Sequence, residues 1–225
     1  MGSDLEQVFN SDELVDRAFR ERLREQAAAA GIRLDLNQLE HFEHYFRLLR
    51  QWNRTINLTA LPLADFPDRT LNRLFLEPLQ ASQFVEDASL RWFDLGSGGG
   101  SPAIPLKIVR PQLRLTMVES KSRKAAFLGE VVRYLALTAT DVLTVRIEEL
   151  TRLVPPGQAD LLTVRAVKIQ KDFLQTVGVL LRLGGRLFLF GSEPVRSLND
   201  SEFRLVERLG LVGGDSTLQV LRRVA

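Results

Sequence analysis

The sequence predicts an α/β fold with a mostly parallel sheet of seven strands, preceded by a helical region. From residue 90 onward, short apolar runs that suit strands alternate with stretches of helical periodicity, which is typical of a parallel sheet with helices on both faces. A short turn joins the last two strand-like runs, which predicts an antiparallel pair. A glycine-rich segment follows the first strand. With 225 residues, 45% of them apolar, the chain can form one sizeable core.

The composition excludes several classes of protein. Charged residues make up 26% of the chain, as in ordinary globular proteins rather than disordered ones. The absence of cysteine excludes disulfides, thiolate metal sites and a cysteine nucleophile, and we expect no metal. No apolar run approaches the roughly 20 residues that span a bilayer, and the polar, acidic start is unlike a signal peptide. We therefore expect a cytoplasmic monomer without membrane association.

The first third of the chain is predicted to be helical. Two pairs that resemble capping boxes, Asn10 with Glu13 and Asn37 with Glu40, predict the starts of two helices. A third helix is expected over 68–80. Apolar residues recur every three or four positions along the second helix and predict its packed face: Leu39, Phe42, Phe46, Leu49 and Trp52.

Residues 86–225 are predicted to form one domain, on which a helical extension of residues 1–85 packs. Its strands are expected over 90–95, 114–119, 142–146, 160–165, 186–190, 203–209 and 217–223. Its helices are expected over 104–109, 122–135, 148–153 and 171–181. Ligands of open α/β sheets bind outside the carboxyl ends of the strands. The residues that follow each strand are therefore the candidates for a site.

The glycine-rich segment after the first strand is the main candidate for a ligand loop. Gly96, Gly98 and Gly100 allow a tight turn and a close approach of a ligand to the backbone. The dinucleotide fingerprint would need a glycine where Ser101 stands, and the Gly-Lys-Ser/Thr ending of a phosphate loop is absent. Asp94, two residues before the first glycine, favours a methyltransferase over a dehydrogenase. A tight turn without a ligand remains the alternative.

Further candidates follow the next strands. Glu119 comes 25 residues after Asp94 and suits the two ribose hydroxyls of an adenosyl nucleoside, of whichever kind. The backbone at Ile147 and Glu148 is placed to edge an adenine, although acids at a helix N-terminus explain this segment equally well. Arg165 ends the fourth strand, where it could bind a cofactor carboxylate, a substrate base or a neighbouring acid.

Three segments, taken in order, carry a resemblance to a known family. They are Trp52-Asn53-x-x-Ile56-Asn57-Leu58-Thr59-Ala60, Asp94-Leu95-Gly96-Ser97-Gly98-x-Gly100-x-Pro102-x-Ile104-Pro105-Leu106 and Arg165-Ala166-Val167. The chain resembles the ribosomal small-subunit RNA methyltransferase G family, also called glucose-inhibited division protein B, from about residue 39 to residue 224. The resemblance implies a Rossmann-like class I fold and S-adenosylmethionine as cofactor. It also implies methylation of a guanine N7 in 16S ribosomal RNA, with the small ribosomal subunit as partner.

The same resemblance implies a cofactor site and shows where this chain departs from the family pattern. The implied cofactor residues are Gly96, Gly98, Ser101, Glu119, Ile147, Glu148 and Arg165. Ser101 and Ala103 stand where the family usually has Phe and Gly, and Lys168 replaces a small residue. The family's basic-His-x-x-Asp-Ser segment becomes Arg73-Leu74-Phe75-Leu76-Glu77-Pro78, and its Ser-Arg-Ala becomes Val164-Arg165-Ala166.

The implied chemistry needs no general base, because N7 of a neutral guanine carries a free lone pair. Positioning then provides most of the catalysis. Arg165 and Lys168 are the candidates to donate to O6 of the base, whereas His41 and His44 are interpreted as surface or packing residues. Three alternatives remain: a nicotinamide-dependent dehydrogenase, a methyltransferase of another guanine or of a protein, and a methyltransferase-fold protein that binds RNA or assists ribosome assembly without turnover.

Overall fold

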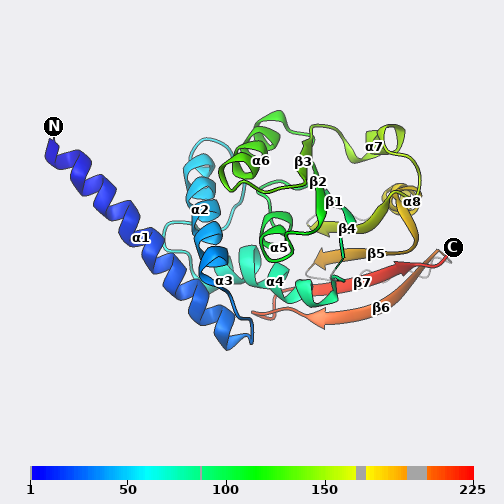
Figure 1. Cartoon of the computed structure of the whole chain (residues 1–225), viewed down its shortest axis with the longest axis horizontal. Coiled ribbons are helices and arrows are strands. Elements are labelled where there is room, and N and C mark those ends of the chain that lie inside the picture. The colour runs from blue at the N-terminus through cyan, green and yellow to red at the C-terminus, as the bar shows by residue number, and fades with distance from the viewer. Residues whose placement is uncertain (1, 87, 166–170, 192–201) are drawn as a thin grey trace.

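The computed structural model describes residues 2–86, 88–165, 171–191 and 202–225. Its centre is a seven-stranded sheet with the order β3-β2-β1-β4-β5-β7-β6 (Figure 1). The strands are β1 Arg91–Leu95, β2 Arg114–Val118, β3 Thr140–Leu143, β4 Ala159–Arg165, β5 Leu181–Gly191, β6 Phe203–Gly210 and β7 Thr217–Arg223. Strands β1 to β5 are parallel, and β7 is antiparallel to both β5 and β6. The predicted α/β fold with an antiparallel C-terminal pair is confirmed.

Helices precede the sheet and connect its strands. Before the sheet come α1 Gly2–Ala29, α2 Leu36–Asn53, α3 Asp68–Leu71, the π-helical turn η1 Asn72–Leu76, α4 Glu77–Ala81 and the 3₁₀ turn η2 Ser82–Phe84. Between strands lie α5 Ala103–Val109, α6 Ser122–Tyr134, α7 Ile147–Leu153 and α8 Lys171–Leu180. No helix in these parts of the chain is both long and apolar enough to cross a bilayer.

Two hydrophobic clusters cover the two faces of the sheet. Successive β1 residues alternate between them, since Trp92 belongs to one cluster and Phe93 to the other. The larger cluster joins the sheet to the buried sides of α2, α4, α5 and α6, whereas the smaller one joins it to α7 and α8. The larger cluster also contains Phe19 of α1 and Phe75 of η1. The N-terminal helices therefore share a continuous core with the sheet.

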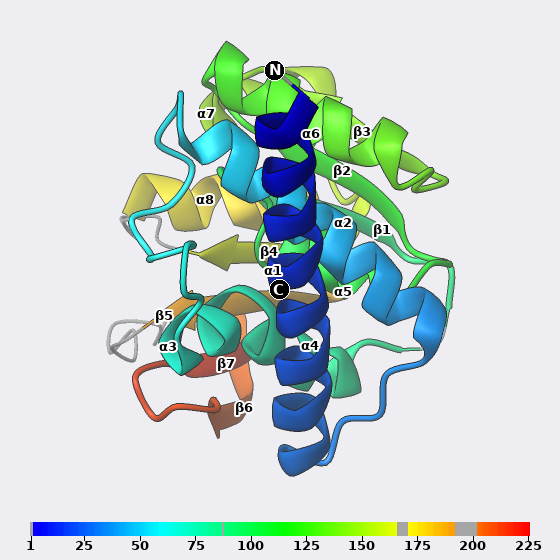
Figure 2. The same ribbon diagram turned by 90° about the vertical axis from the view of Figure 1, so that its left-hand side faces the viewer.

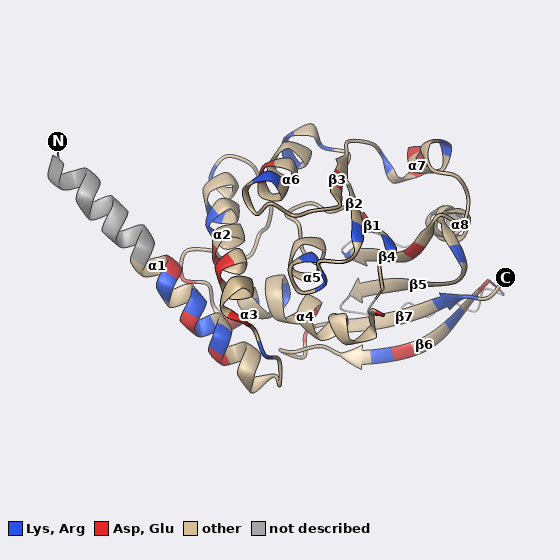
Figure 3. Cartoon of the chain, in the orientation of Figure 1, with Lys and Arg blue, Asp and Glu red and all other residues tan. Residues whose placement is uncertain are grey.

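Helix α1 packs across α2 (Figures 1 and 2). The two helices meet through Phe19 and Phe46, whose stacked rings have centroids 4.1 Å apart. An ion pair of 2.5 Å joins Arg20 to the buried Glu43 beside this contact. Acidic and basic residues alternate along the outer side of the described part of α1 (Figure 3).

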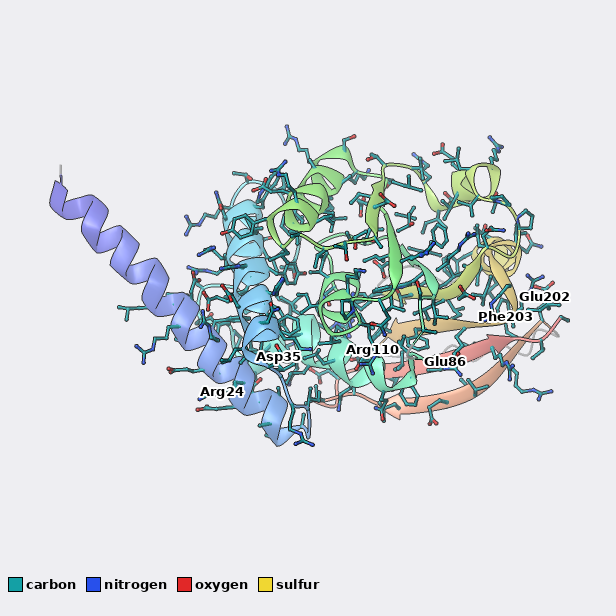
Figure 4. All side chains as sticks on the ribbon, viewed as in Figure 1. Arg24, Asp35, Glu86, Arg110, Glu202 and Phe203 are labelled. Carbon is teal, nitrogen blue, oxygen red and sulfur yellow. The ribbon has the colours of Figure 1, made fainter. Side chains whose placement is uncertain are left out.

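Both predicted N-terminal helix starts are wrong. Helix α1 begins at Gly2 rather than near Asn10, because the preceding residues contain no proline and continue the helix. Helix α2 begins at Leu36, and its cap is Asp35, which lies at the start of the helix in Figure 4. The Asp35 carboxylate accepts from Gln38 N at 2.8 Å, and Asp35 N donates to the Gln38 side chain at 3.1 Å. A true capping box thus begins two residues upstream of the predicted one.

Other element boundaries also differ from the prediction. The third strand pairs with β2 over Thr140–Leu143 instead of 142–146, because its register is set by Leu115 opposite Thr140. Strand β5 begins at Leu181, where a helix was expected to end, because Leu181 pairs with Ala159 of β4 across a register shift. The single helix predicted over 68–80 is a succession of α3, η1 and α4, interrupted by the π-helical turn.

Candidate active site

The glycine loop connects β1 to α5 at the carboxyl edge of the sheet, on the side of the N-terminal helices (Figure 1). Gly96 and Ser97 both donate backbone hydrogen bonds to Val118 O, at 2.9 and 3.1 Å, which ties the loop to the end of β2. Gly96, Gly98 and Gly100 have φ values of 76°, 52° and 92°, in the left-handed region that favours glycine. The alternating glycines therefore produce the turn that the sequence predicted.

Gly98 and Gly100 have different surroundings. A Cβ at Gly98 would have only Gly96 O within 4 Å, at 3.8 Å, so this position faces open space. A Cβ at Gly100 would come within 2.8 Å of Ile104 Cγ1 and 3.1 Å of the Tyr45 hydroxyl. Gly98 thus leaves room for a ligand, whereas Gly100 allows α5 and α2 to pack against the loop.

The open space beside Gly98 is a cavity of about 730 Å³. The glycine loop, Glu119 and Lys124 form one part of its lining. The segment after α2 and the α3–η1 region form the rest, together with Leu49 of α2 and Arg165. The residues from these last two regions are Leu58, Thr59, Ala60, Leu61, Pro62, Pro67, Arg69, Arg73 and Leu74. One cavity therefore has a loop-and-carboxylate half and an arginine-and-proline half.

Glu119, directly after β2, is buried at the wall of this cavity. Its two carboxylate oxygens accept backbone hydrogen bonds, from Gly98 N at 2.9 Å and from Lys121 N at 2.8 Å. These bonds hold the carboxylate in place. Each oxygen has further acceptor capacity, so the group can still bind two neighbouring hydroxyls, as predicted from the sequence.

Asp94 lies behind the loop and does not line the cavity. Its side chain is 1% exposed and accepts from the Thr163 hydroxyl at 2.5 Å, while Trp92 Nε1 donates to the same hydroxyl oxygen at 2.8 Å. The second oxygen, Oδ2, has no hydrogen-bond partner among the described residues. Burial raises the pKa of Asp94 to about 6. A buried, half-satisfied carboxylate of this kind fits a ligand that brings positive charge close to the loop.

Arg165 ends β4 and lines the other half of the cavity, with its side chain 9% exposed. Its Nη1 donates to Arg73 O, its Nη2 lies 3.0 Å from Glu77 Oε2, and its guanidinium carbon lies 4.6 Å from the centroid of the Phe190 ring. Its Nε and Nη2 have no hydrogen-bond partner in the part of the chain that the structure describes, so Nη2 contacts Glu77 as an ion pair. Burial lowers the pKa of Arg165 to about 10, so the group stays protonated at neutral pH.

Several departures from the resembled family pattern contact one another. Pro78 has no N–H, so it cannot bond to the carbonyl of Leu74 four residues earlier. The Ser101 hydroxyl donates to that carbonyl at 2.9 Å. Pro78, Leu74 and Ser101 thus form one compensated local unit beside the cavity.

The structure brings most of the predicted cofactor residues together. Gly96, Gly98, Ser101, Glu119 and Arg165 line the cavity. Asp94 and Gly100 support the loop from behind, as described above. The half-buried Ile147 and the exposed Glu148 begin α7 and are not part of this lining, so their place at the adenine stays a prediction. Lys168 lies outside the described residues.

The sequence interpretation missed the wall formed by residues 58–62, although a signal for it was present. Asn53 Oδ1 accepts from Leu58 N at 2.9 Å and from Thr59 N at 3.0 Å, and its Nδ2 donates to Thr59 O at 3.2 Å. Asn53 thus caps the loop that follows its helix. His44 packs edge-on against Tyr134, at 5.4 Å between ring centroids, in keeping with a packing role.

The sheet order, the glycine loop after β1 and the carboxylate after β2 define a Rossmann-like class I methyltransferase. Solved structures share the fold. TrmN from Thermus thermophilus has a TM-score of 0.54 and 22% identity, over 65% of this chain and 49% of that one. A SAM-dependent methyltransferase from Aquifex aeolicus also has a TM-score of 0.54, with 14% identity over 67% of this chain and 91% of that one.

The family follows from the sequence comparisons. The model of the rRNA small subunit methyltransferase G family matches residues 38–205. The ribosomal RNA small subunit methyltransferase G of Roseiflexus sp. (strain RS-1) is 37% identical over 82% of this chain and 78% of its own length. The protein of the same name from Stutzerimonas stutzeri is 35% identical over 71% and 72%. The chain belongs to the rRNA small subunit methyltransferase G family, which confirms the resemblance.

Proposed function

We propose that this protein transfers a methyl group from S-adenosylmethionine to N7 of a guanine in the 16S RNA of the small ribosomal subunit. Membership of the family and the names of the relatives support the substrate class. The observation that carries the proposal is the single cavity that joins the glycine loop and Glu119 to a half lined by arginines. The methyl donor and the guanine that accepts the methyl group can be bound side by side there, because no part of the protein separates the two halves of the cavity.

The loop half suits the cofactor. Glu119 would accept hydrogen bonds from the ribose hydroxyls, and Gly98 would let the nucleoside approach the backbone closely. Asp94 lies behind the loop, and its Oδ2, which has no hydrogen-bond partner among the described residues, would attract the positive charge of the methionine part from there. We expect Ile147 and Glu148 to edge the adenine. When bound, the cofactor supplies the electrophilic methyl group.

The arginine half suits an unstacked guanine. Leu61, Pro62 and Pro67 provide apolar surface for the face of a base, and Arg165 provides a buried cation for its O6, which leaves the lone pair of N7 free. Arg69, whose side chain is 76% exposed, is placed to bind phosphate at the rim. Lys168 remains a second proposed donor to O6.

The chain's residues would catalyse the reaction mainly by position. N7 attacks through its own lone pair, so no group in the cavity has to remove a proton before transfer. Holding N7 and the methyl carbon in line at about 3 Å turns a bimolecular reaction into an effectively unimolecular one. A protonated Arg165 would keep the base in register throughout the neutral pH range, because its pKa stays near 10.

Methyl transfer from labelled S-adenosylmethionine tests the proposal. The acceptors are small subunits that lack the modification, with naked 16S RNA and bulk protein alongside. We expect label on one RNA guanine, released by the borohydride and aniline treatment that cleaves at N7-methylguanine. Label in protein would identify a different substrate. No label on any acceptor, while S-adenosylhomocysteine still binds, would favour the RNA-binding role without turnover. Light scattering during purification would test the expected monomer.

A further inference from the structure

Glu77, the first residue of α4, has a buried carboxylate that contacts two arginines of the cavity wall, Arg73 of η1 and Arg165 of β4. It is 2% exposed and does not itself line the cavity. Its Oε2 lies 3.1 Å from Arg73 Nη1 and 3.0 Å from Arg165 Nη2. Its other oxygen accepts from the Ser216 hydroxyl at 2.5 Å. One carboxylate therefore connects the N-terminal helices, the end of β4 and the loop before β7.

The π-helical turn before Glu77 supplies a second contact to Arg165. Glu77 N donates to Asn72 O, five residues back, rather than to Arg73 O, which an α-helix would use. The carbonyl of Arg73 is thereby released from the helix, and it accepts from Arg165 Nη1. The irregularity in the helix thus leaves a backbone acceptor available to Arg165.

These contacts restrain Arg165 on several sides. Glu77 and the Arg73 carbonyl engage its two terminal nitrogens, and the Phe190 ring packs against its guanidinium plane. Neither Nε nor Nη2 has a hydrogen-bond partner among the described residues, so the contact of Nη2 with Glu77 is an ion pair only. The long, flexible side chain of Arg165 is thereby held as a fixed cation at the cavity wall. Holding a binding residue in place is the usual role of the groups behind it.

We infer that Glu77 is a positioning residue for the substrate half of the cavity, acting through Arg165. The inference rests on the proposed function, in which Arg165 binds the guanine. Glu77 touches neither cofactor nor base in this arrangement. It sets the orientation of the Arg165 guanidinium group, and the hydrogen bond from Ser216 in turn sets the orientation of Glu77. The loop between the two C-terminal strands thereby contributes to the site through Ser216.

The test compares Glu77→Gln, Glu77→Asp, Arg165→Gln and the double variant Glu77→Gln/Arg165→Gln, by steady-state kinetics on small subunits. Loss of an outer partner typically costs 10- to 100-fold. We therefore expect Glu77→Gln to lower kcat/KM for the subunit by about that factor, with S-adenosylhomocysteine affinity retained. Glu77→Asp should recover most of the loss. The double variant should be no worse than Arg165→Gln alone, because Glu77 acts through Arg165.

A matched control is Glu43→Gln, which neutralises another buried, arginine-paired carboxylate, between α1 and α2 and away from the cavity. It should lose stability without the selective loss in kcat/KM. Should Glu77→Gln fail to fold, Ser216→Ala and Glu77→Asp carry the comparison, because both keep the buried charge. Each should then lower kcat/KM by a smaller factor than Arg165→Gln.

Nitrogen-15 NMR of arginine side chains gives a readout independent of turnover. The Arg165 guanidinium signals, assigned by their loss in Arg165→Gln, should exchange slowly with water in the wild type and quickly in Glu77→Gln. Unchanged signals, or kinetic losses that multiply in the double variant, would overturn the inference. A wild type that methylates nothing would defeat the proposed function alone, because the NMR comparison still decides whether Glu77 positions Arg165.

Discussion

Replacing Asp94 by Asn separates the stability of this protein from its function, with a predictable pH dependence. The side chain is buried and one oxygen has no hydrogen-bond partner among the described residues, so its charge is costly in the cofactor-free protein. Burial raises the pKa of Asp94 from 3.8 to about 6. At about 1.4 kcal/mol per pKa unit, the charge costs up to about 3 kcal/mol at pH 7. The substitution Asp94→Asn removes this charge and recovers that free energy, but the unpaired amide N–H of the new side chain costs about 1 kcal/mol or more.

The sign of the pH effect follows from proton binding. Between pH 3.8 and about 6 the folded protein holds a proton on Asp94 that the unfolded chain has released. The contribution of Asp94 to stability is therefore present below pH 3.8 and is lost as the pH rises through 6. We expect Asp94→Asn to equal or slightly trail the wild type near pH 4 and to exceed it by about 1–2 kcal/mol above pH 7.

Urea unfolding of the cofactor-free proteins across this pH range measures the difference. Calorimetric titration at pH 7 measures the functional cost. Loss of the negative charge behind the loop should lower cofactor affinity about tenfold in Asp94→Asn, roughly 1.4 kcal/mol. A greater loss for S-adenosylmethionine than for S-adenosylhomocysteine would place the carboxylate near the sulfonium, and equal losses would place it near the amino group. A wild type more stable than the variant by a constant amount at every pH would refute the reasoning.

Three further substitutions test the walls of the cavity. Gly98→Asn places a side chain in the cavity and should weaken S-adenosylhomocysteine binding by more than tenfold in calorimetry, roughly 1.4 kcal/mol. Because asparagine tolerates the left-handed backbone, the melting temperature should stay nearly unchanged. Gly100→Ala should instead destabilise the fold by about 1–3 kcal/mol in urea, because its Cβ would meet Ile104 at 2.8 Å; normal stability would contradict the packing. Asn53→Ala removes three hydrogen bonds to the loop at Leu58 and Thr59. It should raise KM for the subunit and lower the unfolding free energy by about 1–3 kcal/mol. Unchanged values would show that the loop keeps its conformation without these hydrogen bonds.

The order of strands and helices was predictable because it depends on local pattern. Apolar runs in strands and helical spacing in α2 and α6 are properties of neighbouring residues. Boundaries were less predictable where a partner decides them. Strand β5 begins at Leu181 because Ala159 of β4 lies opposite, and nothing near Leu181 in the sequence reports that pairing. The cap of α2 was local but was assigned to Asn37, although Asp35 offers the same chemistry two residues earlier.

The loop half of the site was also predictable, since its residues directly follow strands. Parallel strands bring their carboxyl ends to one edge, so Gly98 and Glu119 had to lie close together, and the structure places Glu119 Oε2 2.9 Å from Gly98 N. The arginine half was only partly predictable. Arg165 follows a strand and was recognised, whereas Arg69 and the prolines reach the cavity through the packing of a separate helical region.

Short segments of the sequence were enough to predict the α/β class, the glycine loop and the family, because periodicity, turn chemistry and motif spacing are local properties. The surroundings of Arg165, by contrast, depend on the packing of the folded chain. Glu77, Arg73 and Phe190 come from distant parts of the chain, and the acceptor at Arg73 exists only because the helix turns through a π-helical register there. Such contacts depend on how whole elements pack, and packing across long sequence separations leaves no local pattern from which it can be read.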